Sequence, residues 1–148
     1  MIVERLQELG YSYEPAPLEV LIFHAAVRSG NLVFTSGQIP SLGDVQIKGK
    51  VGADLDLETA QHAAEICAYN CLRAVGAVVD IESVVRVIKV LGMVNVAEGF
   101  DDTSGVINGA SAFLNKVFGD ELTHARSAVG MILPSDWAVE VEIVVEVR

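Results

Sequence analysis

Basic residues are scarce in this 148-residue chain. Ten lysines and arginines stand against twenty aspartates and glutamates, which gives a formal charge of −10. A field of this sign repels phosphate backbones and anionic headgroups, so neither nucleic acid nor a membrane is an expected partner. The sequence has no apolar run of about 18 residues that could span a bilayer, and residues 1–10 lack the pattern of a signal peptide. We therefore expect a cytoplasmic protein.

Cysteine is also rare. The two cysteines, Cys67 and Cys71, lie four residues apart in a helical pattern, and no second pair of Cys or His stands at ligand spacing. Small buried helix residues explain this spacing better than half of a metal site or a disulfide. We expect no metal site.

Apolar residues, by contrast, make up 51% of the chain and charged residues 20%. This composition excludes a disordered acidic protein, and a chain of this length can bury one core. We predict a single domain spanning residues 1–148. Residues 1–17 form an N-terminal appendage, because Ile2, Leu6 and Leu9 recur at helical spacing and a proline-containing connector follows them.

Strand and helix patterns alternate along the remaining sequence. Runs rich in β-branched residues predict strands, and an apolar stripe at helical spacing after Asp56 predicts a capped helix. Residues 39–55 contain one proline and three glycines, which predicts a long loop. The predicted strands are 20–27 and 31–38, forming a hairpin, then 84–95, 126–133 and 138–147; the predicted helices are 56–79 and 103–117.

This order predicts an α+β fold, a two-layer sandwich in which a mixed sheet carries its two main helices on one face. Two helices cannot cover both faces of such a sheet. Yet residues 20–27, 84–94 and 138–147 are apolar at both alternating sets of positions. We therefore expect other subunits to cover the second face.

The last strand carries carboxylates within an apolar run. Glu140, Glu142 and Glu146 share the parity opposite to the residues that would face the helices. On the preceding strand, Arg126 is followed at its own parity by Ala128 and a glycine, which would leave space beside a guanidinium. A guanidinium can bind a small carboxylate through two parallel hydrogen bonds, and a glutamate can accept a proton from an attacking water.

Arg126 and Glu140 would lie far apart if the last two predicted strands formed a hairpin. If the last two strands paired directly, the two residues would lie roughly 16 Å apart along the strand, at about 3.3 Å per residue. A joint site therefore needs a different strand order or two chains. An interface ion pair between Arg126 and a glutamate, without catalysis, is an alternative, and Glu142 and Glu146 fit it better than Glu140.

Other polar residues carry weaker signals. Asn108 fits either a pocket amide or an ordinary helix residue, and Ser36-Gly37 could offer a backbone N–H to a carboxylate. His24, His62 and His124 are scattered and form no Ser-His-Asp or Cys-His pattern. We interpret His24 as a strand residue and His62 as a helix-surface residue, with His124 as a candidate for the pocket lining.

Four segments follow one another along the chain: NLVFTSGQIP at 31–40, Ile107-Asn108 in the second helix, ARS at 125–127, and LP followed by VEVE at 139–142. Together they resemble the Rid family of reactive intermediate deaminases, also called the YjgF or L-PSP family. The resemblance covers about residues 20–148. The longer amino-terminal region and loop look like a divergent subgroup.

The resemblance implies a chorismate-mutase-like sandwich assembled as a homotrimer, with the last strand central in the sheet and sites in clefts between subunits. It implies hydrolysis of 2-imino acids, formed from enamines, to 2-keto acids and ammonia, with no metal or organic cofactor. Arg126 matches the arginine that holds the substrate carboxylate, and Glu140 matches the glutamate associated with the attacking water. Further positions of the cleft are matched by Phe23, Ser36, Gly37 and Asn108.

Two departures leave the function open. Deaminating members commonly have a tyrosine where this chain has Phe23, and often a cysteine where it has Ala128. The leading hypothesis is an imine deaminase with Arg126 as anchor and Glu140 as base. The alternative is a non-catalytic sensor that binds a keto acid or a similar carboxylate. Endoribonuclease activity, a third label of the family, is disfavoured by the acidic charge and the lack of a basic stripe.

Overall fold

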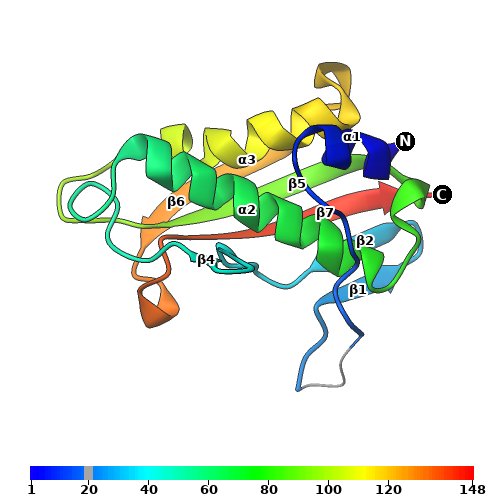
Figure 1. Cartoon of the computed structure of the whole chain (residues 1–148), viewed down its shortest axis with the longest axis horizontal. Coiled ribbons are helices and arrows are strands. Elements are labelled where there is room, and N and C mark those ends of the chain that lie inside the picture. Colours follow the sequence, from blue (N-terminus) through cyan, green and yellow to red (C-terminus); the bar gives the residue numbers. More distant parts are fainter. Residues whose placement is uncertain (19–21) are drawn as a thin grey trace.

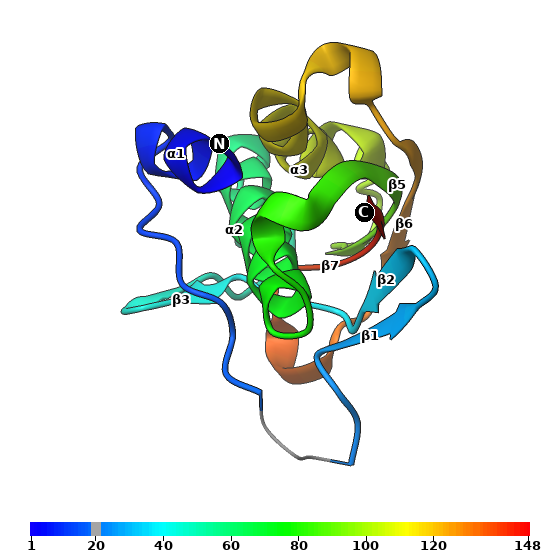
Figure 2. The same cartoon turned by 90° about the vertical axis from the view of Figure 1, so that its right-hand side faces the viewer.

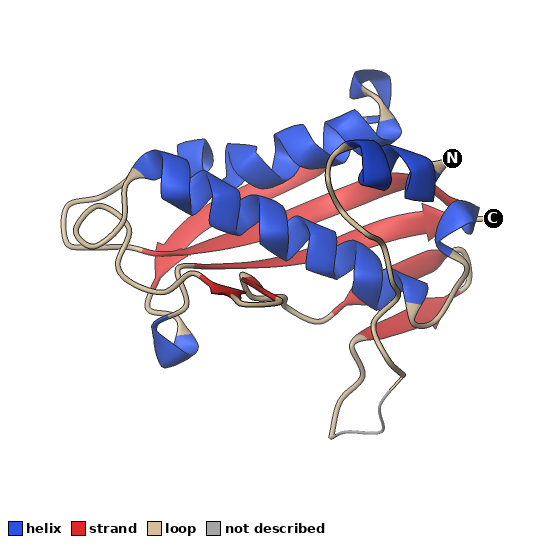
Figure 3. Cartoon of the chain, viewed as in Figure 1, coloured by secondary structure: helices blue, strands red, loops and turns tan. Residues whose placement is uncertain are grey.

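The computed structural model describes residues 1–18 and 22–148. A five-stranded sheet carries two long helices on one face, which confirms the predicted α+β sandwich (Figures 1 and 3). The helices are α1 (Ile2–Glu8), α2 (Leu57–Gly76) and α3 (Thr103–Phe118). The strands of the sheet are β1 (Ala26–Ser29), β2 (Leu32–Thr35), β5 (Val84–Asn95), β6 (Ala125–Met131) and β7 (Val139–Val147), and a small separate hairpin consists of β3 (Ser41–Leu42) and β4 (Val45–Gln46).

The strand order is β1-β2-β7-β5-β6, with β5 and β6 parallel and the other neighbours antiparallel. The last strand is central, as the family resemblance implied. β6 and β7 do not pair with each other, because β5 lies between them. Val90 of β5 lies beside Arg126 on one side and beside Ile143 on the other. This register fixes where the predicted site residues can point.

Local sequence explains where the two long helices begin and how closely they pack. Asp56 and Asp102 each cap a helix by accepting a hydrogen bond from the backbone N–H three residues later, at 2.8 and 3.0 Å. In α3, a Cβ at Gly109 would collide with the backbone carbonyl of Gln61. Glycine at this position therefore lets α3 approach α2 closely.

The core lies between the sheet and the helices. Every second residue of β7, from Val139 to Val147, is buried beneath α2 and α3, as the alternation predicted. The thiols of Cys67 and Cys71 are fully buried, and the Cys71 Sγ lies 3.2 Å from the Val141 carbonyl oxygen. Both cysteines are free, which confirms them as small core residues of α2.

The first predicted hairpin is shorter in the structure. β1 begins at Ala26, so the prediction of a strand through Phe23 and His24 is wrong, while residues 20 and 21 lie outside the described residues. β2 ends at Thr35 rather than at residue 38. After four residues the pairing of β2 with β7 is interrupted at Ser36 and Gly37, and it resumes in a single bridge between Gln38 and Val141. Composition gives strand tendency but does not reveal where the pairing is interrupted.

The amino-terminal segment packs onto the helical layer. Ile2 and Leu6 of α1 belong to the core, and the ring of Tyr11 stacks on Tyr69 of α2 with centroids 4.3 Å apart. The predicted appendage therefore contributes side chains to the same core. Across the described residues, no helix combines the length and the apolar character that crossing a membrane requires.

Within residues 1–18 and 22–148, no helix lies over the opposite face of the sheet (Figure 2). Apolar side chains lie on it beside the carboxylates of β7, in registered rows that run across neighbouring strands. Four of them are between 36% and 52% exposed, namely Val27, Leu32, Phe34 and Val129. We call this surface the open face.

Candidate functional site

Arg126 lies on the edge strand β6 and turns its side chain toward α3. Its Nη1 donates hydrogen bonds to Asn108 Oδ1 at 2.8 Å and to Ser111 Oγ at 3.1 Å. Its Nη2 donates to Ser104 Oγ at 2.7 Å and to the Ser104 carbonyl at 3.3 Å. Residues 104, 108 and 111 share one face of α3 because helical neighbours recur every three or four residues. The structure thus brings Arg126 and Asn108 together.

The Arg126 guanidinium is held entirely by neutral groups. Among the described residues it has no carboxylate within ion-pair distance, and its Nε–H has no acceptor. Neutral acceptors fix the orientation of a guanidinium without neutralising its charge. The arrangement can therefore bind an anion through the Nε edge, with charge-assisted hydrogen bonds.

The sequence suggested open space beside Arg126 at Ala128 and Gly130, and this is wrong. Ala128 packs against the core, and a Cβ at Gly130 would lie 3.0 Å from a methyl group of Val96. Val96 occupies that space because it follows β5 directly, beside the end of β6. The groups that contact the guanidinium come from α3 instead.

His124 joins the Arg126 cluster through Ser111. The His124 Nε2 lies 2.8 Å from Ser111 Oγ. Burial lowers the pKa of His124 below its usual value, and the nearby positive charge of Arg126 lowers it further. The sequence interpretation listed His124 only as a candidate and missed Ser111. The available signal for Ser111 was its position three residues after Asn108, on the same helix face.

Glu140 lies on the open face, beside Met93 of β5. It is half-buried, and this desolvation raises the pKa of its carboxyl above the usual value, with a further contribution from the charge of Glu142. A raised pKa keeps a carboxylate basic enough to accept a proton near neutral pH. Glu142 and Glu146 lie on the same face of β7, as predicted.

Gly37 and Ser36 follow β2 and lie where the chain passes Glu140. A Cβ at Gly37 would overlap the Glu140 carboxylate in its present position, so glycine here lets the backbone lie against that side chain. The Ser36 N–H already donates to the Ala25 carbonyl at 2.8 Å. The Gly37 N–H has no acceptor among the described residues, so it is the better candidate to hold a ligand. Phe23, before β1, is 64% exposed.

Apart from Phe23, the predicted site residues therefore fall into two groups. Arg126 and Asn108 lie at the edge of the helical layer, while Glu140, Ser36 and Gly37 lie together at the open face. One chain does not bring the two groups together. Each group is half of the constellation that the sequence predicted. Among the described residues, no cluster of three His, Cys, Asp or Glu could hold a metal ion.

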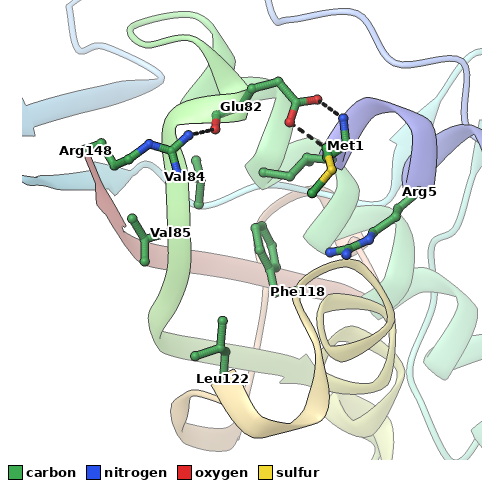
Figure 4. Close-up of a pocket in the computed structure, with 9 residues that line it drawn as sticks. Met1, Arg5, Glu82, Val84, Val85, Phe118, Leu122 and Arg148 are labelled. Atoms are coloured by element: carbon green, nitrogen blue, oxygen red, sulfur yellow. Dashed lines mark hydrogen bonds and ion pairs between the residues drawn. The ribbon is translucent and has the colours of Figure 1, made fainter.

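A cavity lies elsewhere, near the two chain ends (Figure 4). Its volume is about 570 Å³, and Phe118, Val84 and Leu122 supply apolar walls. Glu82 at its rim accepts hydrogen bonds from the backbone N–H groups at residues 2 and 3, at 2.9 and 3.0 Å. These bonds fasten α1 to the body of the protein. None of the predicted site residues lines this cavity, and we assign it no role in the chemistry of Arg126 or Glu140.

Comparison with known proteins decides the family. A family profile described as Endoribonuclease L-PSP matches residues 14–147. The chain belongs to the endoribonuclease L-PSP family, also known as the YjgF or Rid family. The resemblance found in the sequence is thereby confirmed, and the match extends into the connector before β1.

Relatives match this L-PSP chain over nearly its whole length. Protein TCP17 of Trypanosoma cruzi is 37% identical, covering 99% of this chain and 94% of its own. The crystal structure of protein Atu1372 of Agrobacterium tumefaciens is 41% identical, with a TM-score of 0.88 and coverage of 99% and 93%. A Shewanella oneidensis structure, provisionally described as an endoribonuclease, has a TM-score of 0.87 with 99% of both chains covered; at 22% identity it shows the fold alone.

Proposed function

We propose that this protein hydrolyses reactive 2-imino acids to 2-keto acids and ammonia, in clefts where Arg126 of one chain meets Glu140 of another. The observation that carries the proposal is that one surface of the chain presents a cation and another surface presents a base. Arg126 is fixed but has no carboxylate partner among the described residues, and Glu140 is a half-buried base with a raised pKa. Each lacks what the other supplies.

In this proposal Arg126 binds the carboxylate of the imino acid, which places the protonated imine carbon in front of Glu140. A water attacks that carbon while Glu140 accepts its proton, so a C–O bond forms and the C=N bond becomes single. The same proton is then returned to the nitrogen. Glu140 then accepts the proton of the new hydroxyl group as the C–N bond breaks, so the keto group forms and ammonia leaves. One water is consumed, and the last proton passes from Glu140 to ammonia or solvent, which returns the carboxylate to its starting form; the half-buried setting of Glu140 suits these proton transfers.

Assembly follows from the same proposal. The open face carries the partly exposed apolar side chains of Phe34, Leu32 and Val129, and monomeric proteins rarely expose such a contiguous apolar patch. We infer that neighbouring chains cover this face in a homotrimer, which would also carry an Arg126 from one chain toward the Glu140 of the next. A cyclic trimer with identical heterologous contacts provides three such clefts.

A carboxylate-binding sensor is the second candidate, and a specific observation favours it. Phe23 has no hydroxyl to orient a substrate or water, and Ala128 has no thiol. A sensor needs Arg126 and its α3 partners but not the basicity of Glu140. Endoribonuclease activity, which the family description names, is disfavoured by the net charge of −10, because an acidic protein repels the RNA backbone.

The test is imine decay in the presence of the protein. An amino-acid oxidase generates a panel of 2-imino acids in situ, and their disappearance is followed with wild-type protein, with Glu140→Gln and without protein. The proposal predicts faster decay with wild type only. Equal decay in all three, together with measurable binding of a 2-keto acid, would favour the sensor. Equal decay without keto-acid binding would reject both.

A further inference from the structure

Three residues from two parts of the chain form a continuous hydrogen-bonded line. Arg126 of β6 donates from Nη1 to Ser111 Oγ of α3 at 3.1 Å, and Ser111 Oγ lies 2.8 Å from Nε2 of His124, which immediately precedes β6. Ser111 and His124 are half-buried, whereas the other side-chain acceptors of the guanidinium, Ser104 and Asn108, are exposed. The line is therefore the more protected part of the guanidinium's support.

Donor and acceptor capacities fix the Arg126 end of this line. A guanidinium only donates, so Ser111 Oγ accepts from Arg126. The hydroxyl keeps one proton and a second lone pair, so it either donates to an unprotonated His124 Nε2 or accepts from Nε2–H, depending on the tautomer. A neutral imidazole protonated at Nδ1 gives the first of these two arrangements. The lowered pKa of His124, caused by burial and by Arg126, is consistent with that neutral form.

We propose that Ser111 and His124 are positioning residues, which hold the Arg126 guanidinium in the orientation that binds the carboxylate of the substrate. This proposal rests on the proposed function of Arg126 as the carboxylate anchor. Neither residue touches the reacting carbon in it. Without the line, Nη1 keeps only the exposed amide of Asn108, and the long arginine side chain regains rotational freedom that binding must remove again.

The same geometry admits a rival reading in which His124 is a base that activates Ser111 as a nucleophile, because a serine Oγ within 3 Å of an imidazole nitrogen is the usual arrangement for such a pair. The two readings differ in what His124 must supply. Positioning needs only a hydrogen-bond partner for Ser111 Oγ at the place of Nε2, whereas nucleophilic activation needs a base. Glutamine offers an amide oxygen at similar reach but no basicity, so His124→Gln separates the readings.

The experiment compares wild type with Ser111→Ala, His124→Leu and His124→Gln, with His62→Gln on the exposed face of α2 as control. Pyruvate binding is measured by calorimetry and imine turnover by the oxidase-coupled assay. We expect Ser111→Ala and His124→Leu to raise the pyruvate Kd and the imine KM about three- to tenfold, the worth of one hydrogen bond, with kcat within about twofold. His124→Gln should restore wild-type values.

Two outcomes overturn the proposal. Unchanged Kd and KM in both disruptive variants would mean that the line does not orient Arg126. A fall in kcat of about 10²-fold or more in Ser111→Ala, His124→Leu and His124→Gln alike would favour the nucleophilic reading. If wild-type protein neither binds pyruvate nor turns over imines, the proposed function fails.

Nitrogen NMR tests the hydrogen-bonded line independently of any activity. Rotation of the Arg126 Nη groups should be slow in wild type and faster in Ser111→Ala and His124→Leu. Equal rotation rates in all three proteins would reject the positioning role of Ser111 and His124.

Discussion

Arg126 and Glu140 lie on opposite sides of one sheet. Arg126 shares a register row with Val90 and Ile143, both buried beneath the helices, whereas Glu140 lies beside Met93 on the open face. Cross-strand neighbours point to the same face of a sheet, so the two side chains diverge within a chain. A site that uses both must be completed by a second copy of the chain.

Replacing Glu140 with Gln keeps the size of the side chain and removes its basicity. We expect imine turnover to fall by roughly 10² to 10⁴, the usual contribution of a general base, while the assembly state and 2-keto acid affinity are kept. Turnover is measured with the oxidase-coupled assay and assembly by light scattering. Turnover at the wild-type level would remove Glu140 from the mechanism and move the protein toward the sensor.

The pH profile reports the raised pKa of Glu140. A base works only when it is deprotonated, so activity should fall on acidification at a pH above 4.5, the ordinary value for glutamate. Glu142→Gln removes one cause of the raised pKa, after desolvation, and should shift this acid limb to lower pH with turnover near neutral pH within a few fold. Glu146→Gln is the matched control and should not shift it. If activity fell at the same acidic pH in wild type, Glu142→Gln and Glu146→Gln, the assignment of Glu140 as the titrating base would be contradicted.

Arg126→Ala separates an anchor from an interface ion pair. An anchor predicts that 2-keto acid binding is lost, at a cost of about 2 to 5 kcal/mol for a desolvated charge-assisted contact, with the assembly unchanged. An ion pair with an interface glutamate predicts a loosened assembly, because it leaves a buried carboxylate unpaired. Calorimetry and light scattering on the same variant give both readouts, and dissociation with undiminished binding would defeat the anchor role.

Gly37→Ala tests the close approach between Gly37 and Glu140. Because the added Cβ would overlap the carboxylate, the Glu140 side chain must move, and we expect turnover to drop at least tenfold with little change in pyruvate affinity. In a Glu140→Gln background the same change should cost much less, since the base has already been removed. Equal losses in the two backgrounds would show that Gly37 acts independently of Glu140.

Much of the fold followed from the sequence because its patterns are local. Alternation fixed the two faces of β7, Asp56 marked the start of α2, and valine content marked the whole of β5. The strand at Phe23 failed because strand length depends on a pairing partner that composition does not reveal. Pairing order likewise lies beyond local pattern, and the central place of β7 came from the family resemblance.

The arrangement of the candidate site residues could be predicted in part, for a similar reason. Arg126 and Asn108 were each identifiable, and their 2.8 Å contact is local to β6 and α3. The only sequence signal for Ser111 was its spacing from Asn108 on one helix face, and His124 became informative only once the fold placed it 2.8 Å from that hydroxyl. The expected space at Gly130 was filled by Val96, a residue that is distant in sequence and adjacent in space.

Complementation between two inactive variants tests the central claim most directly. Arg126→Ala and Glu140→Gln chains are unfolded, mixed in equal amounts and refolded together, and imine turnover is compared with each variant refolded alone. A site built from Arg126 of one chain and Glu140 of the next predicts recovery of activity at about one quarter of the sites, since random assembly pairs two intact halves that often. No recovery in mixed assemblies that scattering shows to be intact would contradict the shared imine-hydrolase site.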